Sequence, residues 1–252
     1  MEKNDEIYLS VIVPAFNEQE RIAESLYTIK DYLHSQKYRS EIIIVDDGSG
    51  DYTTEIVKTI DIFGEEIKEQ ESTTIMENIK NVGKGFSVAR GILKAKGKII
   101  LFSDADLSTP ISEIEKFLPH LENGSDVVIG SRRLKDSEVE KKPFYRDLMS
   151  YFFNFVVKLL AIKGIRDTQC GFKAFKSEAG HNIALLQKLY GFSFDVEQLY
   201  LANKLEYKIT EVPVKWQHFE GSKVDALKDS IHMLVDILKI RFIHRKLKIN
   251  KT

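Results

Sequence analysis

The segment ILFSDADLSTP, residues Ile100 to Pro110, decides the fold. Residues with the composition of a buried strand run directly into two aspartates, Asp104 and Asp106, which one alanine separates. In open α/β sheets, ligands bind in the crevice beyond the carboxyl ends of the strands. We therefore expect the two aspartates to lie at the carboxyl end of a core strand, where a ligand binds.

The segments on either side of this strand repeat the same order of strand and helix. Apolar runs rich in β-branched residues alternate with segments of helical periodicity, which predicts strands joined by crossover helices. Strands are predicted in residues 8–16, 40–51, 98–106 and 125–133, and helices in residues 18–34, 85–97 and 111–124. The pattern predicts an α/β fold: a single Rossmann-like domain whose mostly parallel central sheet is flanked by helices.

The composition narrows the classes of partner. Lys and Arg number 37 against 38 Asp and Glu, so the net charge of -1 gives no general attraction to nucleic acid. The single cysteine, Cys170, excludes an internal disulfide and fits a reducing compartment. The chain begins without the apolar run of a signal peptide, and no apolar stretch reaches the roughly 20 residues that span a bilayer. We expect a cytoplasmic protein that does not bind nucleic acid.

Polar clusters follow the predicted strands and point to one shared site. They are PAFNE at 14–18, DDGSGD at 46–51, DAD at 104–106 and GSRR at 130–133. The oxygens of Asp104 and Asp106 suit Mg²⁺ or Mn²⁺, which use carboxylates, waters and substrate phosphates as ligands. An isolated Asp-x-Asp is more often surface turn chemistry, so the metal prediction depends on the buried strand before it and on the other clusters.

A family resemblance rests on segments that occur in a fixed order along the chain. They are VIVPAFNE, IIIVDDGSGDYT, NVGKGFSVARG, LFSDADLSTP, VIGSRR, RDTQCGFKAF, FSFDVEQLYLA and EVPVKWQHFEGSKV. Together they resemble the family 2 glycosyltransferases of the GT-A fold. Within that family they are most similar to the branch that makes polyprenyl-phosphate sugars, and there to the dolichyl-phosphate β-glucosyltransferases. The resemblance covers Leu9 to about Val224.

The resemblance implies which residues bind the donor, a nucleoside diphosphate sugar. Those that shape the nucleotide pocket are Pro14, Phe16, Glu18, Val45 and Asp47. Lys84 and Lys223 contact the phosphates, and Asp104 and Asp106 hold Mg²⁺ or Mn²⁺ against the diphosphate. Two simpler interpretations stay open: Asp46 and Asp47 can form a hydrogen-bonded turn, and Lys84 can be a solvated turn lysine.

The acceptor side follows from the chemistry of a polyprenyl phosphate. This nucleophile is already anionic near pH 7 and needs no general base, only cations that hold it in line. Arg132 is the first candidate, and Arg146 and Arg166 can contribute. We expect Asp195 to orient the sugar or an arginine, although in relatives that glycosylate hydroxyl groups an acid near this point is the base. Ser108, where some relatives have a further metal ligand, would be a weaker one.

Two segments suggest contact with the membrane that holds such a lipid. Residues 148–162 are apolar almost all round, which fits a core helix or a helix on the membrane surface. Residues 229–252 predict a basic amphipathic helix and tail after a catalytic domain of residues 1–228. Its apolar residues at helical spacing are Ile231, Leu234, Val235, Leu238 and Phe242, and six Lys or Arg follow from Lys239 onward. Such a segment suits an anionic membrane, and a helix packed on the domain is the alternative.

The functional prediction is therefore inverting transfer of a hexose, glucose from UDP-glucose, to a polyprenyl phosphate such as dolichyl phosphate. UDP-N-acetylglucosamine and GDP-mannose are alternative donors. The enzyme is expected to lie peripherally on the cytoplasmic face of a membrane. Two other functions stay open: a family 2 transferase with a hydroxyl acceptor, in a polysaccharide or a soluble molecule, and a non-catalytic nucleotide-sugar binding protein.

Overall fold

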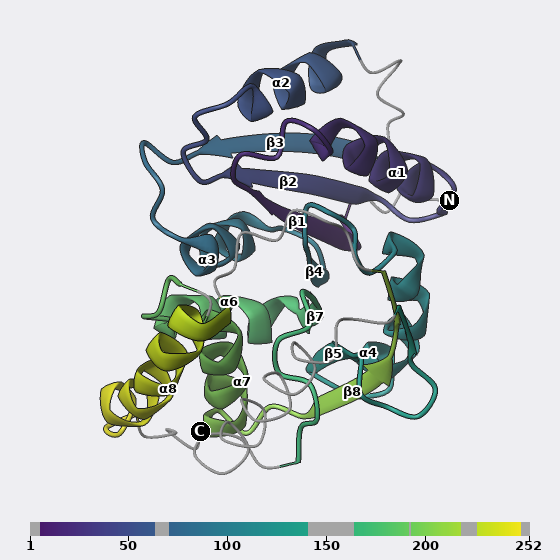
Figure 1. Cartoon of the computed structure of the whole chain (residues 1–252). Coiled ribbons are helices and arrows are strands. Elements are labelled where there is room, and N and C mark those ends of the chain that lie inside the picture. The colour runs from purple at the N-terminus through teal and green to yellow at the C-terminus, as the bar shows by residue number, and fades with distance from the viewer. Residues whose placement is uncertain (1–5, 64–70, 141–163, 192, 218–225, 248–252) are drawn as a thin grey trace.

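A computed structural model describes residues 6–63, 71–140, 164–191, 193–217 and 226–247 (Figure 1). Its main sheet has the strand order β3-β2-β1-β4-β7-β5-β8. These strands are β1 (Leu9–Ala15), β2 (Ser40–Asp46), β3 (Glu71–Glu77), β4 (Ile99–Ser103), β5 (Val127–Ser131), β7 (Phe172–Lys176) and β8 (Ile209–Pro213). All neighbours pair in parallel except β7, which runs antiparallel between β4 and β5. The prediction of a mostly parallel sheet is confirmed.

Helices cover both faces of this sheet (Figure 1). They are α1 (Ile22–His34), α2 (Thr53–Phe63), α3 (Lys84–Lys94), α4 (Leu118–Glu122), α6 (Ser177–Leu186), α7 (Phe194–Lys204), α8 (Ala226–Ile243) and the 3₁₀ helix η1 (Ile111–Lys116). One core joins the sheet to α1, α2, η1 and α4, and the other joins it to α3, α6, α7 and α8. The strands alternate between the two cores: Val11 and Val13 face the first, and Ile12 faces the second. Burial on both faces explains why the strands read as continuous apolar runs.

The segment 111–124 differs from the single helix that the sequence predicts. Its first part is the 3₁₀ helix η1, and a short α-helix, α4, begins after Phe117 with Pro119 in its first turn. Proline has no backbone N–H and is tolerated only at the start of a helix, so it divides the segment in two. A separate pair of short strands, β6 (Glu138–Val139) and β9 (Lys215–Trp216), lies outside the main sheet.

Helix α8 begins earlier than residue 229 and packs on the domain through a face that the sequence did not single out. Ile237 and Ile240 are fully buried in the core shared with α7. Buried His244 lies with Nε2 2.7 Å from Glu197 Oε1, and Ser193 Oγ donates to Asp236 Oδ2 at 2.9 Å. These contacts attach α8 to the beginning and the middle of α7.

The predicted apolar stripe of this helix is exposed where the structure describes it. The exposed fractions are 49% for Val235, 57% for Leu238 and 64% for Phe242. Residues 148–162, the other predicted membrane segment, lie outside the described residues. Among the helices that are described, none combines the length and the apolar character needed to cross a bilayer.

Candidate active site

The loops that follow β1 and β2 are joined by hydrogen bonds, as the shared-site prediction requires. Asn17, with a left-handed φ of 54°, donates its backbone N–H to Ser49 Oγ at 2.9 Å and accepts one from Gly50 N at 2.8 Å. The backbone N–H of Glu18 donates to Thr53 Oγ1 at 2.7 Å. The Glu18 carboxylate itself pairs with Arg21. Two clusters that are distant in sequence therefore form one wall of the site.

The carboxylates of Asp46 and Asp47 both accept hydrogen bonds that stabilise loops. Asp46 accepts hydrogen bonds from the backbone of Gly48 and Ser49 at 3.1 and 3.0 Å. Asp47, which is 3% exposed, accepts from Asn78 Nδ2 at 2.7 Å and from two backbone N–H groups, those of Val82 and Gly83, at 3.0 and 2.8 Å. The structure thus places both residues in the turn role, and contact of Asp47 with a nucleotide stays a prediction.

Pro14 and Val45 lie side by side in the sheet, as paired residues of β1 and β2. Both are buried, and the Val45 side chain packs against α3, where a Cβ on Gly91 would lie 3.2 Å from Val45 Cγ2. Phe16 and Glu18, which follow Pro14 along the chain, are partly exposed. Direct contact of Pro14 or Val45 with a nucleotide stays a prediction.

Asp104 is held tightly at the end of β4. Its backbone N–H donates to Gly171 O at 3.1 Å, and its carboxylate lies so close to the Gly171 Cα that a Cβ there would overlap both oxygens. Lys84 Nζ lies 2.6 Å from Asp104 Oδ1. Asp106 follows in a turn and accepts the backbone N–H of Ser108 at 2.9 Å through Oδ1. Ser108 is 6% exposed, which leaves its hydroxyl little access to a ligand.

These two aspartates fit a divalent metal that takes some of its ligands from the protein and the others from a substrate. In the ranges that the structure covers, no group of three or more His, Cys, Asp or Glu residues is arranged to hold a metal ion. Asp104 and Asp106 would supply two hard carboxylates, and water and phosphate oxygens would complete the shell. That combination is typical of Mg²⁺ and Mn²⁺ at phosphate-transfer sites. The Asp104 side chain is 27% exposed, so part of it is accessible to a ligand.

Lys84 is the first residue of α3 and follows Gly83, whose φ of 124° favours glycine. Its ammonium lies 5.5 Å from the centre of the Phe102 ring. Burial lowers the pKa of Lys84, but the carboxylates of Asp104 and Asp195 outweigh burial and raise it. Lys84 is therefore a cation at neutral pH, paired with the predicted metal ligand rather than solvated.

Asp195 lies at the beginning of α7 and pairs with Lys173 rather than with an arginine. Lys173 is fully buried on β7 and also donates to Cys170 O at 2.7 Å. Burial raises the pKa of Asp195, while Lys173 and Lys84 act to lower it. Lys173 is not among the site residues predicted from the sequence. The one available signal was a lysine within the apolar run FKAF, where a charge needs a partner.

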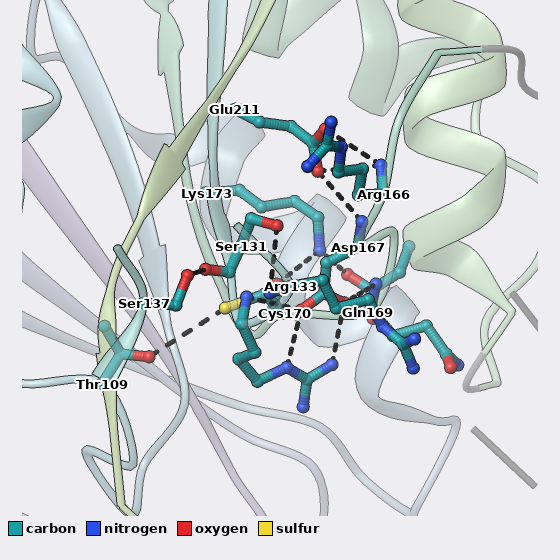
Figure 2. A network of polar contacts seen from close by, with 12 residues as sticks. Thr109, Ser131, Arg133, Ser137, Arg166, Asp167, Gln169, Cys170, Lys173 and Glu211 are labelled. Atoms are coloured by element: carbon teal, nitrogen blue, oxygen red, sulfur yellow. Dashed lines mark hydrogen bonds and ion pairs between the residues drawn. The ribbon is translucent and has the colours of Figure 1, made fainter. Parts of the chain in front are cut away.

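The loop before β7 carries Asp167 and Cys170 (Figure 2), and Asp167 holds Arg132 in a fixed orientation. Buried Asp167 accepts hydrogen bonds from Arg132 Nε at 2.7 Å, from Nη2 at 2.9 Å and from its backbone N–H at 3.0 Å. Glu211 on β8 in turn accepts the backbone N–H groups of Arg166 and Asp167, each at 2.9 Å. Arg132 also lies 5.7 Å from the Trp216 ring. Asp167 leaves the N–H groups at Arg132 Nη1 for another partner.

Cys170 lies in the same loop, in surroundings that do not suit a nucleophile. Its side chain is fully buried, and burial raises the pKa of the thiol to about 11. The thiolate that nucleophilic attack requires is therefore scarce at neutral pH. Two predicted phosphate ligands, Lys223 and Arg146, lie outside the described residues.

Comparison with known families identifies the family to which this chain belongs. The sequence profile described as Glycosyl transferase family 2 matches residues 10–184. The chain is a family 2 glycosyltransferase. The dolichyl-phosphate beta-glucosyltransferase of Dictyostelium discoideum is 42% identical over 251 residues, which cover 94% of this chain and 75% of that protein. The human protein of the same name is 35% identical over 92% of this chain and 74% of its own length.

Solved structures support the GT-A fold of this glycosyltransferase. Glucosyl-3-phosphoglycerate synthase from Mycobacterium tuberculosis, in complex with UDP, superposes with a TM-score of 0.65 at 18% identity. That match covers 93% of this chain and 80% of the synthase. TarS from S. aureus, in complex with UDP-GlcNAc, gives a TM-score of 0.55 at 16% identity over 96% of this chain and 76% of the TarS fragment. At these identities the likeness concerns the fold alone.

The glycosyltransferase brings three of its predicted site residues into one electrostatic cluster. Lys84 pairs with Asp104, and both Asp104 and Asp195 act on the pKa of Lys84. Arg132 belongs to the neighbouring network around Asp167. Its charge acts to lower the pKa of Cys170, and the charge of Asp104 acts to raise the pKa of Arg132. Asp104 follows β4 and Arg132 follows β5, and β7 pairs with both of these strands.

Proposed function

We propose that this glycosyltransferase transfers glucose, with inversion at the anomeric carbon, from UDP-glucose to a polyprenyl phosphate of the dolichyl phosphate class. The observation that carries the proposal is the 42% identity, over 94% of the chain, to a relative named dolichyl-phosphate beta-glucosyltransferase. Relatives of the same name in human and yeast, at 35% and 37% identity, support it.

The donor side of the proposal rests on the cluster around Asp104. Asp104 and Asp106 would hold Mg²⁺ or Mn²⁺ against the diphosphate, where the metal neutralises charge on the departing nucleotide. One crystal structure of the synthase from M. tuberculosis contains Mn²⁺ together with UDP, which supports this metal class. Lys84 would add a positive charge beside the diphosphate. Together these groups favour release of UDP as the leaving group.

The acceptor side needs cations but no base. A lipid phosphate carries its own negative charge at pH 7, so the protein only has to place an oxygen behind the anomeric carbon. Asp167 fixes the Arg132 guanidinium, so that its remaining N–H groups are oriented in advance for a phosphate. Arg146 and Lys223 are further candidates from the sequence. In this proposal the carboxylate of Asp195, anchored by Lys173, orients the sugar.

Helix α8 supplies a surface suited to the membrane that contains the acceptor. Its exposed Val235, Leu238 and Phe242 lie on a helix whose last turns also carry Lys239 and Arg241. Apolar side chains with flanking cations favour an anionic, cytoplasmic membrane face. We expect Leu238→Glu to weaken binding to vesicles with phosphatidylserine, while Leu185→Glu, at an exposed site on α6, does not. Equal binding of both variants would exclude α8 as the contact.

A hydroxyl acceptor is the second candidate function, because burial raises the pKa of Asp195. A carboxylate with a raised pKa is better suited to accept a proton from a hydroxyl group. Asp195 would then be the base, and its loss would abolish turnover. With a phosphate acceptor, Asp195→Asn lowers the rate through poorer orientation of the sugar and through loss of the partner of buried Lys173, but it removes no base.

The test is a transfer assay with purified protein, Mg²⁺ or Mn²⁺, labelled UDP- and GDP-sugars and dolichyl phosphate in detergent. We expect label from UDP-glucose in the organic phase, dependent on the metal and lost in Asp104→Ala. Intact donor binding without any lipid-linked product would refute the acceptor assignment. Preferential transfer from GDP-mannose or UDP-N-acetylglucosamine would refute the assignment of the sugar.

A further inference from the structure

The carboxylate of Asp104 is already occupied by a cation of the protein itself. Lys84 Nζ lies 2.6 Å from Oδ1, and this oxygen has no solvent-exposed surface. The Gly171 Cα closes one face of the same carboxylate. A metal can reach Oδ1 only after the ammonium leaves, and on Oδ2 it would share a single negative charge with Lys84.

Lys84 itself is not fixed in a core. Its side chain is 31% exposed, and it begins helix α3, so it can move without disturbing a core. The amino end of a helix also favours an anion such as a diphosphate. The Lys84 ammonium can therefore move from Asp104 to the diphosphate when an anionic donor binds.

We infer that Lys84 and the divalent metal compete for Asp104, and that the donor diphosphate ends the competition by taking the ammonium. The inference rests on the proposed function, because it requires a metal at Asp104 and Asp106. It adds that metal alone binds weakly and that metal and nucleotide promote each other's binding. By thermodynamic linkage, the factor by which UDP strengthens Mn²⁺ binding equals the factor by which Mn²⁺ strengthens UDP binding.

The test measures free Mn²⁺ by electron paramagnetic resonance, with and without UDP, and needs no acceptor or turnover. We expect Lys84→Met to bind Mn²⁺ at least about tenfold more tightly than the unaltered protein when UDP is absent, within the usual range of coupling factors. The same variant should bind UDP more weakly and show a smaller coupling factor. Lys84→Arg keeps the charge and should restore weak binding of metal alone.

Two controls separate competition at Asp104 from a general change of charge. Lys80→Met removes an exposed lysine from the neighbouring loop and should leave Mn²⁺ affinity within about twofold, since solvent screens exposed charges. Asp104→Asn should abolish Mn²⁺ binding. Circular dichroism of each variant checks that it is folded.

Each outcome decides a different point. Equal or weaker binding of Mn²⁺ alone by Lys84→Met overturns the competition, and so does an equal gain in Lys80→Met. If the unaltered protein binds no Mn²⁺ even with UDP, the metal site of the proposed function fails and the inference fails with it. If Mn²⁺ and UDP bind as expected but no lipid product forms, only the acceptor assignment fails.

Discussion

Replacing Asp167 by asparagine tests the buried network that fixes Arg132. The carboxylate of Asp167 has no exposed surface and accepts three hydrogen bonds from Arg132, at 2.7, 2.9 and 3.0 Å. An amide keeps the shape but removes the charge and places N–H groups opposite N–H donors. The variant therefore leaves the partly buried guanidinium of Arg132 without its counter-ion.

The expected loss of stability follows from the burial of both partners. Removing one member of a buried ion pair costs about 3–5 kcal/mol. The Arg132 side chain keeps 18% exposure, so we reduce this by about a fifth, to roughly 2.5–4 kcal/mol. Urea unfolding at pH 7, followed by circular dichroism, gives the free energy of unfolding, and an unchanged slope shows that the comparison is valid.

Glu138→Gln is the matched control, because it makes the same chemical change in an exposed pair. Glu138 Oε2 lies 3.2 Å from Lys215 Nζ, and the two side chains are 69% and 53% exposed. Exposed pairs contribute about 0–1 kcal/mol, so this variant should unfold almost like the unaltered protein. A loss below about 1 kcal/mol in Asp167→Asn, or a loss equal to that of the control, would refute the role of the network.

The stability that Asp167 contributes should depend on pH in one direction. Burial raises the pKa of Asp167, but Arg132 outweighs it and holds that pKa far below its usual value. A depressed pKa contributes stability above the unfolded value of about 3.9, and this stability is lost as the pH falls. The difference in unfolding free energy between the unaltered protein and Asp167→Asn should therefore be constant above about pH 5 and shrink below about pH 4. A difference that grows in acid would contradict this assignment.

Three further predictions concern the strand β7 and the loop before it. Gly171→Ala has to displace the Asp104 carboxylate, so we expect calorimetric affinity for UDP with Mn²⁺ to fall at least about tenfold, or about 1.4 kcal/mol; unchanged affinity would show that Asp104 is not a donor ligand. Lys173→Met leaves a buried carboxylate unpaired and should cost about 3–5 kcal/mol in urea unfolding. The double variant Lys173→Met with Asp195→Asn should recover most of that loss, and a double variant as unstable as the single one would argue against the pair. Iodoacetamide at pH 8 should leave buried Cys170 unmodified in the folded protein, and rapid alkylation seen by mass spectrometry would contradict its burial.

The sequence was most informative for strands whose residues are all buried, whichever face of the sheet they lie on. Strands buried on both faces are continuous apolar runs, so β1, β2, β4 and β5 could be located, and the polar residues at their carboxyl ends gave the candidate site. The antiparallel insertion of β7 between β4 and β5 could not, because strand order depends on contacts between residues far apart in the chain. Only the three-dimensional pairing reveals that Asp167 reaches Arg132 across 35 positions.

Helix α8 shows the limit of periodicity. The stripe containing Leu238 and Phe242 has helical spacing, but Ile237 and Ile240 are the residues that the domain buries. A helix with apolar residues on more than one face can pack through either of them, and the packing partner decides. The partner here is α7, to which His244 and Asp236 attach the helix.

The most direct test of the proposed reaction compares two acceptors that differ in one group, dolichyl phosphate and the corresponding alcohol, dolichol. With UDP-[¹⁴C]glucose and Mn²⁺, we predict transfer to the phosphate and none to the alcohol. We also predict that Asp195→Asn keeps measurable transfer, because an ionised phosphate needs no base. Transfer to the alcohol at a comparable rate, abolished in Asp195→Asn, would contradict the phosphate acceptor and establish Asp195 as a general base.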